Sequence, residues 1–269
     1  MIIDFHTHVF PDKIAGATIG ALANNSGATP YTDGTVKGMI DALDRANADI
    51  AIALPVLTKP TQFESVLNFA ISVNDEYSNG KRKLISFAGM HPDCDDIDTK
   101  MAQIKNSGIK GIKIHPDYQA TFFDDQRYID IINFAKKYDL IVVTHSGVDD
   151  GYAGHPVRCT VDRILNVLEK TNYSKLVLAH FGAHRLWEDV LEKLAGKNVY
   201  FDTAFTFNDI DEKLFKDIVA KHGADKILFA TDCPWGEIKD DYKILSSYNL
   251  DESVFDKITY KNARKLLNL

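Results

Sequence analysis

Cysteine is scarce in this chain of 269 residues, and so are basic clusters and long apolar runs. The three cysteines, Cys94, Cys159 and Cys233, are too few and too scattered for a disulfide framework, and no two have the spacing of a zinc ribbon. No uncharged apolar stretch approaches the ~20 residues of a membrane span, and no basic segment precedes an apolar region at the N-terminus. We therefore expect a cytoplasmic protein of a reducing compartment, without membrane contact.

Positive charge is scarce as well. The formal net charge is -7, and the longest basic cluster is Lys81-Arg82-Lys83. This distribution lacks the electrostatic footprint of a nucleic-acid-binding protein, so a small-molecule substrate is favoured. A hydrophobic content of 45% over 269 residues is enough for one large core, and we expect a single domain over residues 1–269. The sequence leaves open whether the chain forms a homo-oligomer.

Short apolar runs recur along the chain and alternate with amphipathic segments. One such segment carries Ile97, Met101 and Ile104 at helical spacing and stops at Gly108. Strands that are apolar throughout and joined by helices predict a parallel sheet. Eight units of this kind predict an α/β fold, a (β/α)8 TIM barrel, with a doubly wound open sheet as the competing architecture. The runs are Ile2–Phe5, Ile50–Pro55, Leu84–Met90, Gly111–His115, Leu140–His145, Lys175–His180, Val199–Ala204 and Ile227–Asp232.

Polar residues that can bind metals end several of these runs. His6 and His8 lie two residues apart at the end of the first run, so in a strand both imidazoles point to the same side. This is a metal-ligand spacing, although in isolation two strand histidines are as readily hydrogen-bonded core residues. A closed barrel brings strand ends around one axis, whereas an open sheet spreads them out, and this favours the barrel. The other strand-end candidates are His115, His145, His180 and Asp232.

Five ordered motifs, spread over essentially the whole chain, carry a resemblance to a known family. They are Asp4-Phe5-His6-Thr7-His8, Gly111-Ile112-Lys113-Ile114-His115-Pro116, Thr144-His145-Ser146-Gly147, Leu178-Ala179-His180-Phe181-Gly182 and Ala230-Thr231-Asp232-Cys233-Pro234-Trp235. With these motifs the sequence resembles the amidohydrolase superfamily. The most similar branch is the amidohydrolase-2 group, which contains aminocarboxymuconate-semialdehyde decarboxylase-like enzymes and predicted metal-dependent hydrolases. The motifs are specific for the superfamily and not for one reaction.

The resemblance implies a TIM barrel of the metal-dependent hydrolase type that holds a divalent metal. The ligands it implies are His6, His8, His145 and Asp232, and His180 would be either a second-metal ligand or an acid/base residue. Imidazoles with one carboxylate and an open position suit Zn²⁺, although Mn²⁺, Fe²⁺ and Co²⁺ also fit. Asp232 would also take the proton of a metal-activated water, which makes Asp232 and His180 the catalytic candidates.

Lys113 and His115 decide how many metals the site would hold. They alternate across Ile114, so both can point into the barrel. Related binuclear enzymes bridge two metals with a carboxylated lysine on this strand, but many members of the branch bind one metal, and we expect one per chain. Lys113 would then pair with a barrel carboxylate such as Asp202, or contact substrate together with His115. Asp4 is expected on the face of His6, hydrogen-bonded to a ligand histidine.

Substrate specificity is expected in the loops that follow the strands. The longest covers residues 9–35 and predicts either a lid insertion after the first strand or a helix packed on the barrel rim. Arg158, His155 and Arg185 lie in the loops after the fifth and sixth runs and are candidates for binding a substrate carboxylate. Arginines at such positions are also commonly solvated or ion-paired.

Three functions remain from the sequence. The preferred one is hydrolysis of a small-molecule amide, lactone or ester by a metal-activated water. The alternative is metal-dependent nonoxidative decarboxylation of a carboxylated unsaturated or aromatic substrate. A non-catalytic metal-binding barrel is disfavoured, because His180 and Asp232 add acid/base groups that a structural site does not need. A TatD-like nuclease is disfavoured because Gly111–His115 stands where its glutamate-bearing strand would be, and because the chain is acidic.

Overall fold

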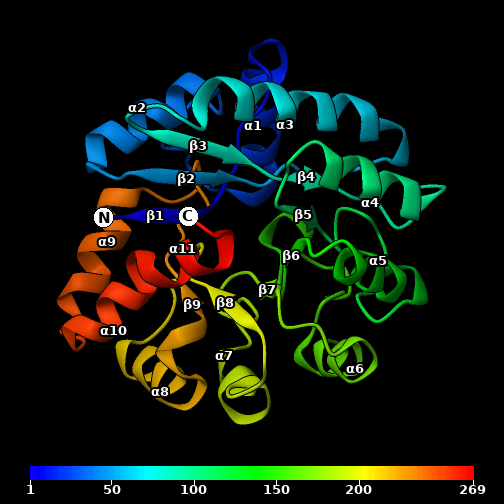
Figure 1. Cartoon of the computed structure of the whole chain (residues 1–269). Helices are drawn as coiled ribbons and strands as arrows, with labels where there is room; N and C mark the ends of the chain where they lie inside the picture. Colours follow the sequence, from blue (N-terminus) through cyan, green and yellow to red (C-terminus); the bar gives the residue numbers. More distant parts are fainter.

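The computed structural model describes residues 1–269 as strands around one axis with helices outside them (Figure 1). All strand pairs are parallel. Phe87 separates β3 from β4, which are two halves of one predicted run, so all eight predicted runs form strands. The strands are β1 (Ile3–Thr7), β2 (Ile50–Ala53), β3 (Lys83–Ser86), β4 (Ala88–Gly89), β5 (Gly111–Ile114), β6 (Ile141–Thr144), β7 (Leu176–Leu178), β8 (Tyr200–Asp202) and β9 (Ile227–Leu228).

Two sheets, β1-β2-β3 and β4-β5-β6-β7-β8-β9, together form the barrel wall. At the break between β3 and β4, the Phe87 N–H still donates to the Ala53 carbonyl at 2.9 Å. On the other side, the Phe5 N–H donates to the Phe229 carbonyl at 2.9 Å, which joins β1 to the segment that follows β9. Both gaps between the sheets are therefore bridged, and the predicted (β/α)8 TIM barrel is confirmed.

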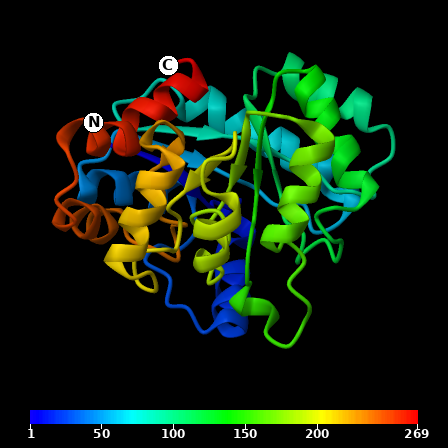
Figure 2. The ribbon, with the colours of Figure 1, turned by 90° about the horizontal axis from the view of Figure 1, so that it is seen from below.

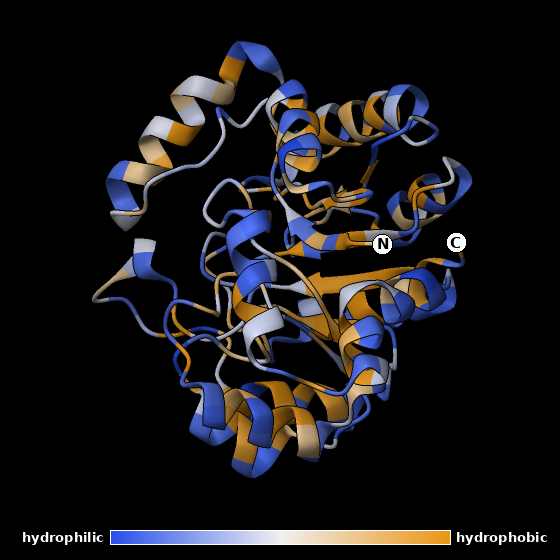
Figure 3. Ribbon diagram, turned by 90° about the vertical axis from the view of Figure 1, so that its left-hand side faces the viewer, coloured by the Kyte–Doolittle hydropathy of each residue, from blue (hydrophilic) through white to orange (hydrophobic).

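Helices cover the outside of the barrel, and their apolar faces point inward (Figure 3). Several begin at a residue whose side chain accepts a backbone N–H, as Thr35, Asp125 and Asp211 do. None of them combines the length and the apolar character that crossing a membrane requires. The α-helices are α1 (Asp12–Ser26), α2 (Val36–Ala46), α3 (Phe63–Tyr77), α4 (Ile97–Asn106), α5 (Gln126–Lys137), α6 (Val161–Thr171), α7 (Trp187–Asp189), α8 (Glu212–His222), α9 (Ile238–Ser247), α10 (Glu252–Asp256) and α11 (Asn262–Leu267), and the short helical turns are η1 (Pro60–Gln62), η2 (Asp150–Tyr152), η3 (Val190–Leu194), η4 (Ala224–Lys226) and η5 (Lys257–Lys261).

The hydrophobic core has two layers. The larger layer lies between the strands and the surrounding helices. The smaller one joins Phe5 of β1, Val143 of β6 and Leu228 of β9 to Leu266 of α11. Strands from opposite sides of the ring meet only inside the barrel, so this layer fills the barrel interior, and α11 closes one end of it. The three cysteines are free and buried within the fold.

A bulge in β1 turns His6 into the barrel. The register between β1 and β2 shifts by one residue between Asp4 and Thr7, which breaks the alternation of side chains. Phe5 and His6 therefore both face inward, while Oδ2 of Asp4 accepts a hydrogen bond from Thr231 Oγ1 at 2.6 Å. Asp4 accepts a hydrogen bond from the predicted ligand His6, but from its backbone N–H at 3.2 Å and not from its ring.

Residues 9–35 contain α1 and return along the end of the barrel opposite α11. Figure 2 shows α1 in blue and the segment after β6 in green at one end of the molecule, with the red C-terminal helix at the other. Helix α1 contacts η2, and the Tyr31 N–H donates to the Pro234 carbonyl at 2.8 Å, so the segment packs beside the ends of β6 and β9. Its role as a lid remains a prediction.

Two glycines after β6 differ in how closely other backbone atoms pack against them, and this difference can be tested. Gly147 and Gly154 have φ of +86° and +83°, so alanine is strained at both by ~1–2 kcal/mol. A Cβ at Gly147 would also lie 2.1 Å from the backbone nitrogen of His184, whereas nothing lies within 4 Å at Gly154. We expect Gly154→Ala to lower the free energy of unfolding by only the backbone strain and Gly147→Ala to lower it by more than ~4 kcal/mol, measured by urea denaturation. Equal losses would contradict this packing.

Candidate active site

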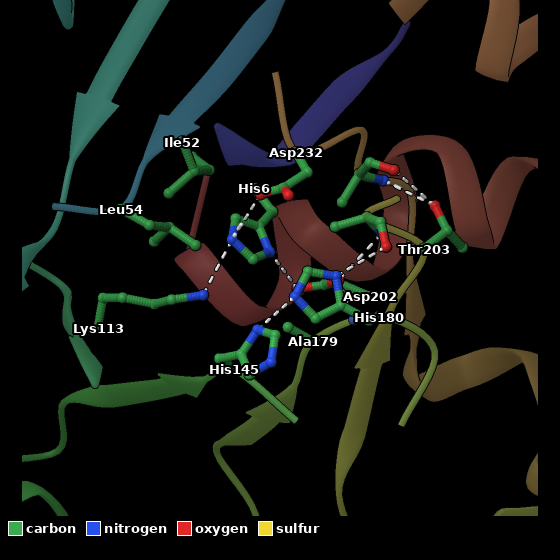
Figure 4. Close-up of polar contacts among 12 residues, drawn as sticks. His6, Ile52, Leu54, Lys113, His145, Ala179, His180, Asp202, Thr203 and Asp232 are labelled. Atoms are coloured by element: carbon green, nitrogen blue, oxygen red, sulfur yellow. Dashed lines mark hydrogen bonds and ion pairs between the residues drawn. The ribbon is translucent and has the colours of Figure 1, made fainter. Parts of the chain in front are cut away.

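The ends of the strands bring the predicted residues to one place inside the barrel mouth (Figure 4). His6 lies on β1 and Lys113 on β5, both fully buried. The other members lie one to four residues beyond a strand end, and they meet because all strands of a parallel barrel end at the same side. They are His8 after β1, His115 after β5, His145 after β6, His180 after β7 and Asp232 after β9.

Three of these residues form a group with metal-ligand spacing. His6, His8 and Asp232 each offer one ligand atom, and these atoms lie within 4.8 Å of one another. Nε2 of His8 lies 3.0 Å from Oδ1 of Asp232, and Nε2 of His6 lies 3.3 Å from the same oxygen. The other ring nitrogens are held by acceptors: Nδ1 of His8 donates to the Leu54 carbonyl and Nδ1 of His6 donates to Asp202 Oδ2, both at 3.0 Å. In these tautomers, assigned from the acceptors, both Nε2 atoms are unprotonated and lie beside Asp232.

The charges of this group suit a cation. Burial would raise the pKa of Asp232, but His6 and His8 outweigh burial, so the pKa is lowered and the group stays a carboxylate. Burial lowers the pKa of His6, and the neighbouring Lys113 lowers it further. At neutral pH the site therefore presents the neutral imidazole of His6 and the carboxylate of Asp232, which are the protonation states that a divalent metal requires of these ligands. The residues present fit a divalent metal.

His180 and His145 lie beside this group as a hydrogen-bonded pair. Nδ1 of His180 donates to the Ala204 carbonyl at 3.0 Å, so its Nε2 accepts the bond from His145 Nδ1 at 2.9 Å. The ring centroid of His180 is 5.5 Å from that of His6. Burial lowers the pKa of His180 to about 3, so the ring is neutral at pH 7 and its Nε2 is a proton acceptor. The pair places an imidazole nitrogen that can accept a proton beside the group of His6, His8 and Asp232.

His180 and Asp232 also share an unusual backbone conformation. Their φ angles are +58° and +66°, in the left-handed region that residues other than glycine seldom adopt. Hydrogen bonds stabilise this strained backbone. The His180 N–H donates to Asp202 Oδ1 at 3.0 Å, and the Asp232 N–H donates to the His6 carbonyl at 2.9 Å. Strained backbone that the surroundings fix in this way is typical of functional sites.

Lys113 contacts His6 and not the carboxylate that the sequence suggested. Its Nζ donates to His6 Nε2 at 2.9 Å, while Oδ2 of Asp202 accepts the hydrogen bond of His6 Nδ1. Burial lowers the pKa of Lys113 to about 8, although Asp202 and Asp232 favour its charged form. The ion pair of Lys113 with Asp202 is not formed. Lys113 instead occupies the nitrogen that His6 would use to bind a metal.

A second group lies further out. The ring of His115 stacks on that of His145 with centroids 4.3 Å apart, and Asp149 joins them with ligand atoms within 4.8 Å of one another. Asp149 and Asp117 were not singled out from the sequence. The available signal was their position, since Asp117 follows His115 by two residues and Asp149 follows His145 by four. Burial raises the pKa of Asp149 to about 7.

The three candidates for carboxylate binding lie in different settings. Arg158 is mostly buried beside the second group, with Nη1 3.5 Å from Asp117 Oδ1. Arg185 is half exposed and pairs with Asp150 at 3.1 Å and with Asp209 at 3.3 Å, so its charge is already compensated. His155 is exposed. The structure therefore brings only Arg158 next to the clustered histidines, and a substrate role for each of the three remains a prediction.

A family model described as Amidohydrolase, that of the amidohydrolase-2 family, matches residues 3–269. The chain belongs to this family. The fold is shared with solved structures: a 2,6-dihydroxybenzoate decarboxylase complexed with 2,6-dihydroxybenzoate is similar at 17% identity and a TM-score of 0.71, with 100% of this chain and 99% of the other covered. No curated protein sequence matches.

Two further structures resemble this amidohydrolase over its whole length. A dihydroxybenzoic acid decarboxylase from Polaromonas sp. JS666, with bound manganese and the inhibitor 2-nitroresorcinol, has 16% identity and a TM-score of 0.69, with 100% and 97% of the two chains covered. A structure described as amidohydrolase II has 17% identity and a TM-score of 0.73, with 100% of both chains covered. The resemblance drawn from the motifs is confirmed, and this amidohydrolase is an enzyme of a metal-dependent family.

Metal content tests the first ligand group. We expect His8→Gln to lose most of the bound metal, because His8 Nε2 faces Asp232 at 3.0 Å. His91 is the matched control, since it is also a buried histidine after a strand, but its Nδ1 accepts the backbone N–H of Asp93. His91→Gln should retain the metal content of the wild type, measured by plasma mass spectrometry on protein purified without chelator. Equal metal in all three proteins would place the metal elsewhere.

Lys113→Met tests whether the lysine competes with a metal or bridges two. Methionine keeps the length of the side chain and removes the donor that occupies His6 Nε2 at 2.9 Å. We expect one metal equivalent in wild type and variant, with tighter binding in the variant because His6 Nε2 is released. Two equivalents in the wild type and one in the variant would show instead that a modified lysine bridges a pair.

Proposed function

We propose that this amidohydrolase is a metal-dependent nonoxidative decarboxylase of a small carboxylated substrate that is unsaturated or aromatic. The observation that carries the proposal is the group of His6, His8 and Asp232 beside the neutral ring of His180. The sequence alone favours hydrolysis. Two of the similar structures are described as decarboxylases of dihydroxybenzoates, and this likeness supports placing decarboxylation first.

The metal would be held by His6, His8, His145 and Asp232, and we favour Zn²⁺ because three imidazoles and one carboxylate suit it, while Mn²⁺ remains compatible. When bound, such an ion supplies a Lewis acid that polarises an oxygen of the substrate. The chain contributes ligand orientation. Asp202 and the Leu54 carbonyl fix the rings of His6 and His8, so that neither ring has to turn when a metal binds.

His180 would move the proton in this reaction. Decarboxylation breaks the bond between the substrate carbon and its carboxylate; CO₂ leaves, the electron pair stays on the carbon, and the carbon takes up a proton. Nε2 of His180 can take a proton from a substrate hydroxyl and return it to that carbon, because its Nδ1–H stays fixed on the Ala204 carbonyl. The strained backbone at His180 holds the ring in this position.

Arg158 is the best placed cation for a second polar group of the substrate. Its backbone and Nη1 approach Asp117 at 3.4 Å and 3.5 Å, which are long hydrogen bonds, so the guanidinium keeps donors free for a ligand. Tyr118 and Tyr152 lie nearby, with ring centroids 5.4 Å apart, and Tyr118 stacks on His115. Aromatic side chains next to a cation suit a planar, negatively charged substrate.

Hydrolysis of an amide, lactone or ester is the second candidate. Lys113 on β5 favours it, since this buried amine lies beside His6, where a carboxylated lysine would bridge two metals. In that reaction Asp232 would accept the proton of the attacking water. Two metal equivalents in the wild type and one in Lys113→Met would support this candidate.

Product analysis separates the two reactions. The metal-loaded protein would be incubated with a panel of hydroxybenzoates and unsaturated dicarboxylates, and with amides and lactones as the comparison set. We expect CO₂ release without incorporation of labelled oxygen from H₂¹⁸O into the organic product. His180→Gln should bind metal as the wild type does and lose turnover by ~10²–10⁴-fold, because only the proton transfer is removed. Label in the product and no CO₂ would establish hydrolysis.

A further inference from the structure

Two buried acceptors beside the metal-binding histidines have no hydrogen-bond donor. They are Nε2 of His145 and Oδ2 of Asp117, which lie 3.8 Å apart. His145 is 7% exposed and Asp117 is 3% exposed, so solvent does not replace the missing donors. Buried polar atoms are nearly always paired, and an orphaned pair requires an explanation.

The hydrogen bonds of the neighbouring rings determine which atom of His145 carries its proton. Nδ1 of His180 donates to the Ala204 carbonyl, so Nε2 of His180 must accept. The donor in that contact is Nδ1 of His145. A neutral His145 has no second proton, and its Nε2 therefore points a lone pair toward the carboxylate of Asp117. Two hydrogen-bond acceptors, Nε2 of His145 and Oδ2 of Asp117, therefore face each other. A proton on Nε2 would be needed to join them by a hydrogen bond.

We propose that Asp117 is a positioning residue of the metal centre, acting through His145. When a divalent cation takes Nδ1 of His145, the proton of that ring moves to Nε2, and a small shift of the ring that shortens the 3.8 Å separation lets Nε2 donate it to Oδ2 of Asp117. No proton enters or leaves the ring, and both orphaned atoms become paired. A carboxylate behind a ligand histidine fixes the ring and makes the nitrogen that binds the metal more basic. The inference rests on the proposed function in one respect, that His145 is a ligand.

Asp117 is held in place for this role. It follows β5 in the sequence His115-Pro116-Asp117, and its Oδ1 is approached by the backbone N–H of Arg158 at 3.4 Å and by Nη1 of Arg158 at 3.5 Å. These contacts occupy Oδ1 and leave Oδ2 for His145. Asp117 therefore connects a metal ligand after β6 with the arginine proposed to contact the substrate.

A second cation among His115, His145 and Asp149 is the rival explanation. Two features disfavour it. The rings of His115 and His145 are parallel within 10°, so their lone pairs do not converge on one point. The Tyr118 N–H approaches Nδ1 of His115 at 3.4 Å, so the proton of His115 lies on Nε2, where it faces Asp149 Oδ2 at 3.6 Å. A donor already faces this carboxylate, whereas none faces Asp117 Oδ2.

The test compares Asp117→Asn with Asp149→Asn, which makes the same substitution at another largely buried carboxyl group near the same histidines. Asparagine at 149 can still accept the Gly151 N–H, which donates to Oδ1 at 2.8 Å in the wild type. Metal-free proteins would be titrated with Zn²⁺ against a competing chelator. We expect the dissociation constant to rise ~10–100-fold in Asp117→Asn and to change far less in Asp149→Asn.

Thermal unfolding of the metal-free proteins supplies the second readout. The amide of asparagine at 117 can donate to Nε2 of His145, so metal-free Asp117→Asn should melt at the temperature of the wild type or above it. A merely structural carboxylate would instead lower the melting temperature together with the affinity. That result, or equal losses of affinity in both variants, would overturn the proposal. A second Zn²⁺ equivalent that disappears only in Asp149→Asn would establish the rival cation site.

A measurement on the wild type covers the case in which Asp117→Asn does not fold. Nitrogen-15 NMR of the histidine rings should show Nε2 of His145 changing from unprotonated to protonated when Zn²⁺ binds. An Nε2 that stays unprotonated would overturn the inference even if the enzyme releases CO₂. Conversely, the protonated Nε2 would support the inference even if the product analysis shows hydrolysis, so the two proposals fail independently.

Discussion

The site depends on the hydrogen bonds that the carboxylate of Asp202 accepts. Its Oδ2 accepts Nδ1 of His6 at 3.0 Å, while its Oδ1 accepts the backbone N–H groups of His180 at 3.0 Å and of Ala204 at 3.1 Å. One buried side chain at the end of β8 thus orients a ligand ring and fixes the strained backbone of the acid/base candidate. Burial would raise the pKa of Asp202, but His6 outweighs it and keeps the group charged.

Hydrogen bonds to the backbone orient other histidine rings at the barrel mouth in the same way. Nδ1 of His8 donates to the Leu54 carbonyl, and Nδ1 of His180 donates to the Ala204 carbonyl. With the outer nitrogens fixed in this way, the inner nitrogens of His6, His8 and His180 are acceptors. His145 differs, since its inner nitrogen is the donor and its outer nitrogen has no partner. This exception is what connects His145 to Asp117.

Much of this arrangement could be predicted from residue patterns. The apolar runs located all eight strands, and the polar residues that end them located the site, because parallel strands finish at one end of a barrel. The environment of Asp4 and His6 could not be predicted, because the bulge that reverses their faces depends on pairing with β2. Asp117 and Asp149 also escaped prediction, since loop carboxylates are common and only tertiary packing brings these two to His145 and His115.

Lys113 imposes the remaining constraint on the chemistry. A buried amine with a pKa lowered to about 8 is charged in most molecules at pH 7, and it donates to the nitrogen that His6 would offer to a metal. A cation that binds His6 must displace this hydrogen bond, and the lysine then depends on the carboxylates of Asp202, Asp232 and Asp149 to offset its charge. A negatively charged substrate would offset the same charge. A metal bound together with an anionic substrate would therefore leave less uncompensated charge in the barrel than a metal alone, which supports the proposed carboxylated substrate.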